Sequence, residues 1–355
     1  GAGGSIGSEL SRPAVTYGAA KVVLDEQSED ALYAIEAELS LLIRNVNPDC
    51  QLLPILGSVL DEDRVTQVLK QYSVQTVYHA AAYKHVPLVE HNVLQGVQNN
   101  ALGTGVVASV AKKLNIERFI LISTDKAVRP TNVMGATKRL AEIVVQRLAA
   151  ENHSNTIFSM VRFGNVLGSS GSVVPLFKKQ IEQGGPITVT HPEINRFFMT
   201  IPEAASLVIQ AGSMAKGGDV FVLDMGEPVK IADLAKQMIR LSGRTVKDTA
   251  NPTGDIEVVF SGLRPGEKLY EELLIGNNAA GTEHPKILTA DEEFASSEEL
   301  ERVLTGIRSA IAKNDSQTAR QLLIEIVKDF APSSSNVDLL QTDASKQTKN
   351  VIKLG

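Results

Sequence analysis

The residue types best suited to chemistry lie in one short stretch, Ser123-Thr124-Asp125-Lys126. A hydroxyl, a carboxylate and an ammonium follow one another there, and such groups can hold a substrate hydroxyl and exchange protons with it. Further along, Met134 and Lys138 stand four residues apart in a segment of helical character, so their side chains share one helix face. A polar turn in which Asp125 acts as a cap is the purely structural alternative.

Two segments must position this stretch. Residues 118–122, apolar after the first, predict a buried strand, and residues 141–145 continue a helix. In an open α/β sheet, ligands bind beyond the carboxyl ends of the strands. The stretch is therefore a candidate site by its place in the chain as well as by its residue types.

Length and composition exclude several classes of protein. The chain has 355 residues, 43% of them hydrophobic, which suffices for one large domain or two lobes. Its formal net charge is −6 and it has no run of Lys and Arg, so nucleic acid is not an expected partner. The single cysteine, Cys50, excludes an internal disulfide and fits a reducing compartment. No apolar run approaches the roughly 18 residues of a membrane span, so we expect a soluble cytoplasmic domain without membrane contact of its own.

A glycine-rich loop opens the sequence. Gly1, Gly4 and Gly7, with Ser5 and Ile6 between them, form a G-x-x-G-x-x-G loop that leads into a helix. Glycines let the backbone approach a pyrophosphate, and the amides of a helix N-terminus favour an anion. Such a loop normally follows an apolar strand. We therefore expect the chain to be a fragment of a longer protein, in which a strand precedes Gly1 and any membrane anchor lies upstream of it.

The next strand ends in an acid. Residues 21–24 predict a strand, and Asp25 follows where an acid would hydrogen-bond an adenosine ribose. An acid there repels a 2′-phosphate, so NAD is favoured over NADP; Glu26 strengthens this preference, while Ser28 leaves NADP open. The other cofactor-binding candidates are Ser58 and Val59 at a strand exit, and the small residues Ala80, Ala81 and Ala82.

The order of elements predicts the fold class. Strands and helices alternate through about residue 162, which indicates a doubly wound parallel sheet with helices on both faces. We assign residues 1–165 to an NAD-binding domain whose sheet is completed by about 197–225.

The remaining residues are assigned to a smaller lobe and a tail. Residues 166–196 and 226–330 are expected to form an α/β lobe that binds substrate, with two amphipathic helices after about residue 296 packed on it. Residues 331–355 are rich in Ser, Thr, Asn and Lys and are expected to be a flexible tail.

Basic side chains bear on what the site could bind. His79, His85 and His91 match no standard metal-ligand spacing, so no metal is expected. Arg196 and Arg264 are candidate clamps for a diphosphate, because a guanidinium grips phosphate oxygens in a bidentate way. Either arginine could instead form a surface ion pair.

Several separated motifs together resemble one group of enzymes. The chain is similar to nucleotide-sugar 4,6-dehydratases of the polysaccharide-biosynthesis (capsule) branch of the extended short-chain dehydrogenase/reductase family, which act on UDP-N-acetylglucosamine. The resemblance runs from Gly1 to about Lys286. It implies a Rossmann fold, bound NAD, a UDP-sugar substrate, and a homodimer or higher homo-oligomer built through helices near 91–114 and 133–152. The motifs are the glycine loop and residues 79–87, 123–126, 132–139, 191–194 and 263–268.

One position departs from the wider superfamily. Its catalytic helix carries Y-x-x-x-K, whereas this chain has Met134 at the tyrosine position and retains Lys138. A thioether cannot take a proton from a sugar hydroxyl. The methionine resembles the large, membrane-anchored form of these dehydratases, which retain the configuration at carbon 5.

The resemblance also implies a mechanism. Hydride leaves carbon 4, the carbon 5 proton is removed as the carbon 6 hydroxyl departs as water, and hydride returns to carbon 6. Asp125 would be the acid and Lys126 the base, which requires a lowered lysine pKa. Thr124 would hold the carbon 4 hydroxyl and Lys138 the nicotinamide ribose. The group that deprotonates the carbon 4 hydroxyl stays open between Asp125 and a water relayed through Thr124. The resemblance also implies one further cofactor-binding residue, Asn100. The substrate-binding residues that it implies are Lys84, His85, Asn165, Val174, Arg196, Arg264 and Glu267.

Two other functions compete with this one. A nucleotide-sugar 4-epimerase needs hydride transfer at carbon 4 but no acid and base for carbons 5 and 6, so the Asp125-Lys126 pair speaks against it. A catalytically silent NAD-binding regulatory protein is favoured by Met134. The charged groups Lys84, Asp125, Lys126 and Lys138 speak against that second alternative.

Overall fold

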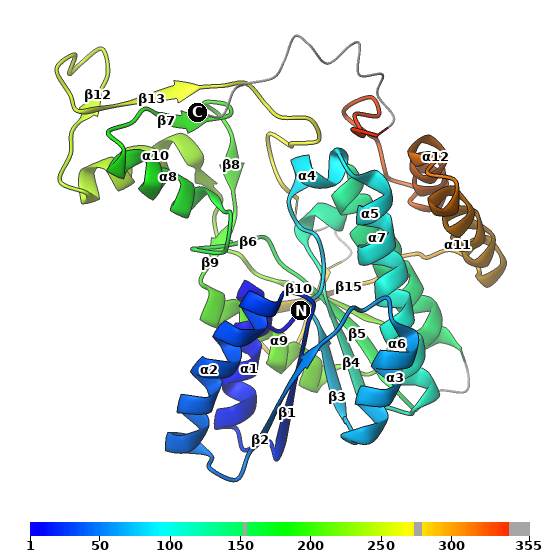
Figure 1. The fold of residues 1–355 in the computed structure, drawn as a ribbon. Coiled ribbons are helices and arrows are strands. Elements are labelled where there is room, and N and C mark those ends of the chain that lie inside the picture. Colours follow the sequence, from blue (N-terminus) through cyan, green and yellow to red (C-terminus); the bar gives the residue numbers. More distant parts are fainter. Residues whose placement is uncertain (152–154, 273–278, 341–355) are drawn as a thin grey trace.

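A six-stranded sheet forms the centre of the larger domain in this computed structural model, which describes residues 1–151, 155–272 and 279–340 (Figure 1). Its strand order is β14-β15-β10-β5-β4-β3, and the four strands from β10 to β3 are parallel. The strands are β3 (Thr76–His79), β4 (Arg118–Ile122), β5 (Ile157–Arg162), β10 (Asp219–Leu223), β14 (Ala279–Gly281) and β15 (Ile287–Ala290).

Helices cover both faces of this sheet. Strands β4 and β5 are buried almost throughout, as their continuous apolar sequences require when both faces are covered. One apolar core joins the sheet to α1 and α9, and another joins it to α3, α6 and α7. The predicted doubly wound parallel sheet is therefore confirmed. The helices that cover this sheet are α1 (Ser5–Thr16), α3 (Glu62–Gln71), α6 (Gly103–Lys113), α7 (Val133–Ala150) and α9 (Ile201–Met214). Helix α2 (Glu29–Val46) packs instead on the two strands that precede and follow it in the chain.

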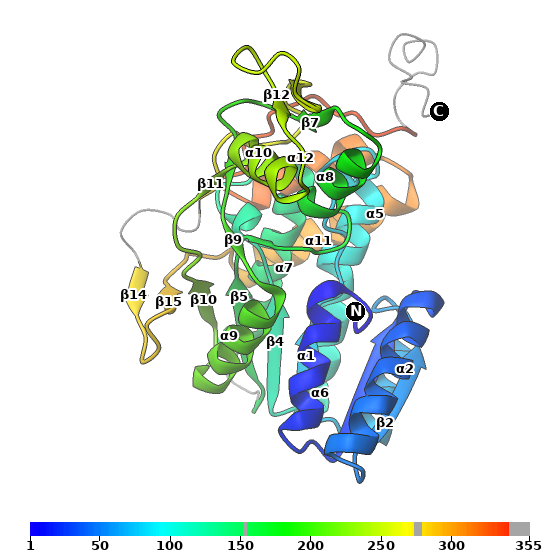
Figure 2. The same ribbon diagram turned by 90° about the vertical axis from the view of Figure 1, so that its left-hand side faces the viewer.

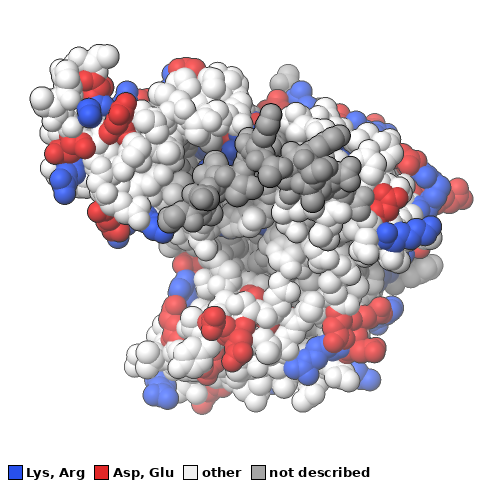
Figure 3. Space-filling model, turned by 45° about the horizontal axis from the view of Figure 1, so that its top comes forward, with Lys and Arg blue, Asp and Glu red and all other residues white. Residues whose placement is uncertain are grey.

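The smaller lobe lies above the sheet domain in both ribbon views (Figures 1 and 2). Its three strands have the order β12-β13-β7, and their apolar core is shared with α8 and α10. Figure 3 shows that the surface is hollowed between this lobe and the sheet domain. The elements are β7 (Ile187–Val189), β12 (Val246–Lys247), β13 (Ile256–Phe260), α8 (Val173–Glu182) and α10 (Ile231–Leu241).

Two short strand pairs connect the lobe to the sheet domain. Strand β6 (Asn165–Val166) pairs with β9 (Phe198–Met199), and β8 (Asn195–Arg196) pairs with β11 (Val229–Lys230). The chain therefore passes between the two parts near residues 165, 198 and 230, close to the hollow.

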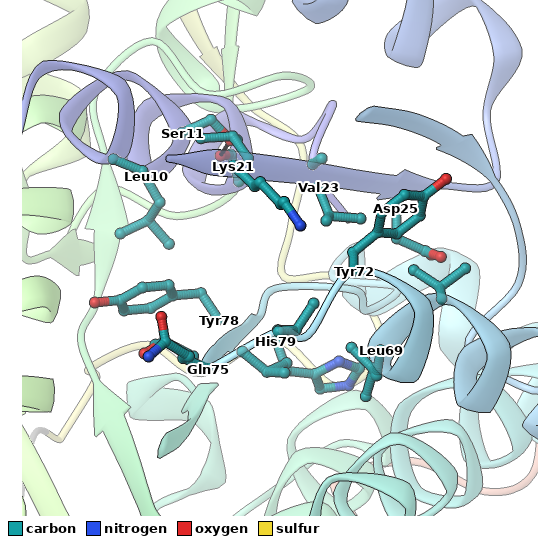
Figure 4. A pocket seen from close by; sticks show the side chains of 18 of the residues that line it. Leu10, Ser11, Lys21, Val23, Asp25, Leu69, Tyr72, Gln75, Tyr78 and His79 are labelled. Atoms are coloured by element: carbon teal, nitrogen blue, oxygen red, sulfur yellow. Dashed lines mark hydrogen bonds between the residues drawn. The ribbon is translucent and has the colours of Figure 1, made fainter. Parts of the chain in front are cut away.

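A gap divides the sheet near the glycine loop. Strands β1 (Lys21–Glu26) and β2 (Gln51–Leu56) pair with each other, and among the described strands β1 has no other partner. A cavity of about 700 Å³ separates β1 from β3, with the side chains of Lys21 and Val23 on one side and those of Gln75 and Tyr78 on the other (Figure 4). Two facing strand edges suit an extended segment. A strand upstream of Gly1 stays a prediction, and this cavity is the position that it fits.

The C-terminal helices do not pack on the smaller lobe, so that expectation is wrong. Helices α11 (Ser297–Ala312) and α12 (Ser316–Ile326) share an apolar core with α5 (Val93–Val97) and α7. Strands β14 and β15 likewise extend the central sheet. Amphipathic periodicity identifies an apolar face but not the element that covers it. Part of the helix surface expected to bind a second subunit is thus covered by the chain itself.

The beginning of the expected flexible tail is ordered. The amides of Ala331 and Ser333 donate to the carbonyls of Pro130 and Thr131, each at 3.0 Å, and Asp338 accepts from the amide of Val93 at 2.9 Å. The expectation is therefore wrong for residues 331–340, because specific backbone partners outweigh a polar composition. Residues 341–355 lie outside the described part of the chain.

Candidate active site

Two adjoining cavities follow the carboxyl edge of the sheet. The first, of about 750 Å³, lies between this edge and the smaller lobe, and the second, of about 470 Å³, lies along the glycine loop. The first cavity is lined by the predicted residues Gly4, Ser5, Ile6, Gly7, Ala80, Ala82, Lys84, His85, Thr124, Lys126, Met134, Lys138 and Asn165. The second is lined by Gly1, Gly4, Ser5, Asp25, Val59, Ala80, Ala81 and Ala82.

Other predicted residues line neither of these cavities. The hydroxyl of Ser28 caps α2 by accepting from the amide of Ala31, and that of Ser58 accepts from the amide of Leu60. Arg264 is exposed. Asn100, Asp125, Val174, Arg196 and Glu267 also line neither cavity, so for all of these residues contact with a ligand stays a prediction.

The glycine loop is held tightly against the strand ends. A Cβ atom on Gly1 would lie 2.6 Å from the amide nitrogen of Ala81, and one on Gly7 would lie 2.0 Å from the carbonyl oxygen of Gly1. Only glycine fits at these two positions. The amide of Gly3 donates to the carboxylate of Glu26 at 3.0 Å. Glu26 thus braces the loop, while Asp25 lines the cavity.

Asp125 is the most perturbed acid of the site. It begins a short 3-10 turn, η2 (Asp125–Ala127), directly after β4 and is 1% exposed. Its Oδ1 accepts from the Thr124 hydroxyl at 2.8 Å and from Lys126 Nζ at 3.0 Å. Burial, together with the negative charge of Glu271, raises the Asp125 pKa to about 7. A carboxyl group with such a pKa can donate a proton near neutral pH.

Glu271 is a member of the site that the sequence analysis missed. Its side chain is 3% exposed and lies 2.7 Å from Lys126 Nζ and 3.2 Å from Arg196 Nε, and it accepts from Asn165 Nδ2 at 3.0 Å. Burial opposes its ionised form, but the charges of Lys126 and Arg196 outweigh burial and lower the Glu271 pKa to about 2. We call Asp125, Lys126, Arg196 and Glu271 the site cluster. The two glutamates after Arg264-Pro265-Gly266-Glu267-Lys268 were the available signal, but no spacing rule connects them to residue 125.

Lys126 differs from the expectation for a base. Burial alone would lower its pKa, but the carboxylates of Asp125 and Glu271 outweigh burial and raise the Lys126 pKa. The expected lowering is therefore wrong for this arrangement, which holds Lys126 as a cation. As a base, Lys126 must first pass a proton to a neighbour.

Arg196 is occupied by the chain itself. Its Nη1 donates to the carbonyl of Asn195 at 2.6 Å and its Nη2 to that of Lys268 at 2.8 Å, while Nε faces Glu271. The side chain thus braces the segment that carries Glu271. Arg196 was expected to clamp a diphosphate, but in these contacts its guanidinium donors point to acceptors of the protein itself.

Met134 and Lys138, both on α7, line the first cavity. Lys138 Nζ donates to the carbonyl of Ile122 at 2.7 Å, and burial lowers its pKa to about 8. Met134 is 2% exposed and belongs to an apolar core. Asn100 was expected to bind cofactor, yet its side-chain amide is hydrogen-bonded within the protein. Its Oδ1 accepts from the Tyr83 amide at 2.8 Å, and its Nδ2 donates to the Tyr83 carbonyl at 2.9 Å and to the Thr137 hydroxyl at 3.0 Å. Asn100 therefore fixes the Tyr83 loop to α7.

A second buried ion cluster lies behind Ser123. The Ser123 hydroxyl donates to Glu142 Oε1 at 2.6 Å, Arg162 Nε donates to the same oxygen at 2.8 Å, and Arg139 Nη1 donates to Glu142 Oε2 at 3.0 Å. Arg162 also pairs with Glu292. We call Arg139, Glu142, Arg162 and Glu292 the support cluster, because it joins the last residue of β5 to the helix that carries Lys138 and, through Ser123, also holds the end of β4.

The doubly wound sheet, the glycine loop and the Met-x-x-x-Lys helix beside Thr124 define an extended short-chain dehydrogenase/reductase fold. Within that class, the chain belongs to the polysaccharide biosynthesis protein family, whose model matches residues 1–292. None of the described helices is both long enough and apolar enough to cross a membrane.

Two curated relatives are similar over most of this chain. The capsular polysaccharide biosynthesis protein CapD of Staphylococcus aureus is 55% identical over 277 residues, which cover 78% of this chain and 44% of CapD. The probable polysaccharide biosynthesis protein EpsC of Bacillus subtilis (strain 168) is 51% identical over 288 residues, covering 81% of this chain and 46% of EpsC. The chain thus spans less than half the length of each.

Solved structures agree with the fold. Pen from Bacillus thuringiensis has a TM-score of 0.72 at 32% identity, covering 83% of this chain and 86% of Pen. A double mutant of DesIV, a dTDP-glucose 4,6-dehydratase of Streptomyces venezuelae solved with NAD bound, has a TM-score of 0.63 at 17% identity, covering 78% of this chain and 87% of DesIV. The second likeness concerns the fold alone.

Proposed function

We propose that the chain is an NAD-dependent nucleotide-sugar 4,6-dehydratase that converts UDP-N-acetylglucosamine to a 4-keto-6-deoxy sugar for surface polysaccharide synthesis. The observation that carries the proposal is the buried Asp125-Lys126 pair, in which an acid with a pKa of about 7 faces an amine 3.0 Å away beside a cavity. Eliminating water needs one proton donor and one proton acceptor. This pair supplies both.

The residues along the glycine loop fit a dinucleotide. The loop is so close to Ala81 that a side chain on Gly1 would clash, and it leads directly into the N-terminus of α1. Asp25 lines the same cavity and suits a ribose diol, which favours NAD over NADP. When bound, NAD supplies the acceptance and return of hydride.

The elimination can be written with this chain's own groups. Lys126, as the neutral amine, takes the proton from carbon 5, and the electrons of that bond form the double bond to carbon 6. The carbon 6–oxygen bond breaks, and the hydroxyl leaves as water with the proton of Asp125. The products of this step are a lysine ammonium and an aspartate carboxylate. The two side chains lie 3.0 Å apart. The Lys126 ammonium then returns a proton to carbon 5 as carbon 6 is reduced, and Asp125 regains its proton from the carbon 4 hydroxyl of the next substrate, directly or through a water held by Thr124, which resets both groups.

Two neighbours assist the pair. The Thr124 hydroxyl donates to Asp125 and lines the cavity, so it is placed to exchange a hydrogen bond with a sugar hydroxyl. Met134 has no proton to exchange, so deprotonation of the carbon 4 hydroxyl is assigned to Asp125 in its ionised form or to a water held by Thr124. Retention at carbon 5 is proposed from the methionine resemblance.

The direct test is product analysis. The chain is incubated with NAD and UDP-N-acetylglucosamine, and the nucleotide sugar is examined by mass spectrometry. We expect a product lighter by the mass of one water. A product of unchanged mass but altered configuration at carbon 4 would indicate a 4-epimerase. An unchanged sugar, with NAD bound to the protein, would contradict the proposal and favour a silent NAD-binding protein.

A further inference from the structure

Glu271 has no place in the elimination as written, although it touches both Lys126 and Arg196. We infer that Glu271 is a positioning residue that accepts a hydrogen bond from the protonated carboxyl group of Asp125 and so keeps that group available as an acid. The catalytic meaning of this contact rests on the proposed dehydration. The shared proton itself can be tested without any substrate.

The first observation is an unpartnered oxygen. Asp125 Oδ1 has two donors, Thr124 and Lys126, whereas Oδ2 is buried and has no donor among the described residues. A buried carboxylate oxygen without a donor is costly. A proton on Oδ2 removes this cost, because the neutral carboxyl group can then donate to the carboxylate of Glu271.

The second observation is that Glu271 is the better anion of the two. Lys126, Arg196 and Asn165 all present donors to its oxygens, from η2, β8 and β6. Asp125 and Glu271 both contact Lys126 Nζ, at 3.0 Å and 2.7 Å. Two buried carboxylates this close together cannot both be ionised without a large penalty. Because Glu271 has two cations and an amide, whereas Asp125 has one cation and a hydroxyl, the proton belongs on Asp125.

The third observation is the space around Asp125. A Cβ atom on Gly164 would lie 3.0 Å from Asp125 Oδ2 and 3.3 Å from Phe197 Cβ. The absence of a side chain on Gly164 therefore leaves room for the carboxyl group. Charged groups that face the two carboxylates are Lys126 and Arg196 in contact, and Lys268 at longer range.

The test is a carbon-13 NMR titration of the whole chain labelled at the aspartate carboxyl carbons. Asp125→Asn assigns the signal of interest by deleting it. We expect the wild-type signal to titrate near neutral pH and the signal in Glu271→Gln to titrate lower by about one pH unit or more, because the repelling charge is gone and Lys126 then serves Asp125 alone. Glu272→Gln is the matched control: its side chain is 42% exposed and pairs with Arg129 and Lys268, and it should leave the titration unchanged.

An Asp125 signal that titrates in the ordinary aspartate range in the wild type would overturn the inference. So would an unchanged midpoint in Glu271→Gln. If that variant does not fold, Glu271→Asp replaces it; this change keeps the charge but withdraws the carboxylate, so the midpoint should fall to a value between the wild type and an ordinary aspartate. An unchanged midpoint there would also overturn the inference.

Turnover separates this inference from the proposed function. In an active wild type, Glu271→Gln should move the alkaline limb of the pH profile of kcat to lower pH, whereas a purely structural role would lower kcat at every pH alike. A chain with no turnover but a Glu271-dependent titration would leave the positioning intact and defeat the dehydratase. Turnover in a wild type whose Asp125 titration does not depend on Glu271 would support the dehydratase and contradict the positioning role.

Discussion

The site cluster and the support cluster have the same formal charges, yet they shift the pKa of a buried carboxyl group in opposite directions. The site cluster raises the pKa of Asp125, and the support cluster lowers that of Glu142. Each has two carboxylates and two cations. In the support cluster both oxygens of Glu142 accept from donors, two of them guanidinium groups, and the charges of Arg162 and Arg139 outweigh burial and lower the Glu142 pKa to about 2. In the site cluster one oxygen of Asp125 has no donor among the described residues, and burial raises the Asp125 pKa to about 7.

The difference shows how one fold separates fixed charges from mobile protons. Arginine stays protonated under all ordinary conditions, so a carboxylate surrounded by guanidinium groups is a permanent anion. Lysine can lose its proton, and a carboxyl group beside both a lysine and another carboxylate can exist in either form. The support cluster is therefore suited to hold the end of β4 against α7, and the site cluster is suited to move a proton.

The largest expected effect is on turnover. Asp125→Asn keeps the shape of the acid but removes its proton, and general acid catalysis contributes about 10²- to 10⁴-fold to a rate. We expect kcat for formation of the 4-keto-6-deoxy sugar to fall by about that factor while NAD binding, measured by calorimetry, is unchanged. Activity within a few-fold of the wild type would remove Asp125 from the mechanism.

The next effect is on stability. Glu142→Ala leaves Arg162, which is 1% exposed, without its main partner, and breaking a buried pair in this way costs about 3–5 kcal/mol. Urea unfolding at pH 7 should show a loss of that order. A loss below about 1 kcal/mol would mean that the support cluster does not brace the fold.

The two clusters should also differ in the sign of their pH dependence. Asp125 has a higher pKa in the folded chain than its ordinary value of 3.8, so its folded form binds the proton more tightly and stability from this group falls as pH rises from about 4 to 7. Glu142 has a lower folded pKa than its ordinary 4.5, so its contribution is present above that pH and is lost as pH falls from 4.5 to about 2.

Two variants isolate the dependence of the free energy of unfolding on pH that Asp125 and Glu142 each contribute. Relative to the wild type, Asp125→Asn should gain stability as pH rises through the first interval, and Glu142→Gln should lose its disadvantage as pH falls through the second. Each slope is at most about 1.4 kcal/mol per pH unit for one proton. Urea unfolding at a series of pH values measures both. Slopes of equal sign would erase the distinction between the clusters.

The smallest effect is expected outside both clusters. Glu272→Gln changes a carboxylate that follows Glu271 directly but is 42% exposed. Exposed pairs contribute about 0–1 kcal/mol, so the free energy of unfolding should change by less than that and kcat should stay the same. A larger change in either quantity would mean that an exposed carboxylate in this segment matters as well, so that the role of Glu271 would not depend on its burial in the site cluster.

Much of the fold was predictable because its signals are local. A continuous apolar run identified β4, and the alternation of strands and helices through about residue 162 identified the doubly wound sheet. Ser123, Thr124 and Lys126 line one cavity together with Met134 and Lys138, as expected from strand ends in an open sheet, whereas Asp125 is buried behind them. Packing partners were not predictable, because an amphipathic helix such as α11 or α12 does not encode which surface it covers.

The missed parts of the site depend on long-range geometry. Glu271 reaches Lys126 only because Arg196 and the carbonyls of Asn195 and Lys268 hold its segment in place. The sequence shows no partner for Arg196, and a guanidinium grips phosphate oxygens in a bidentate way, which is why a phosphate role was expected. The raised pKa of Lys126 has the same origin, since one of its two carboxylate neighbours, Glu271, comes from a distant part of the chain.

The most direct measurement is proton NMR of the nucleotide sugar after incubation of the chain with UDP-N-acetylglucosamine and NAD in deuterated water. We expect a new carbon 6 methyl signal together with deuterium at carbon 5, because the proton removed there exchanges with solvent before it is replaced. The coupling pattern would report retention at carbon 5. A sugar that keeps its carbon 6 hydroxyl and its carbon 5 proton, with NAD bound, would contradict the account.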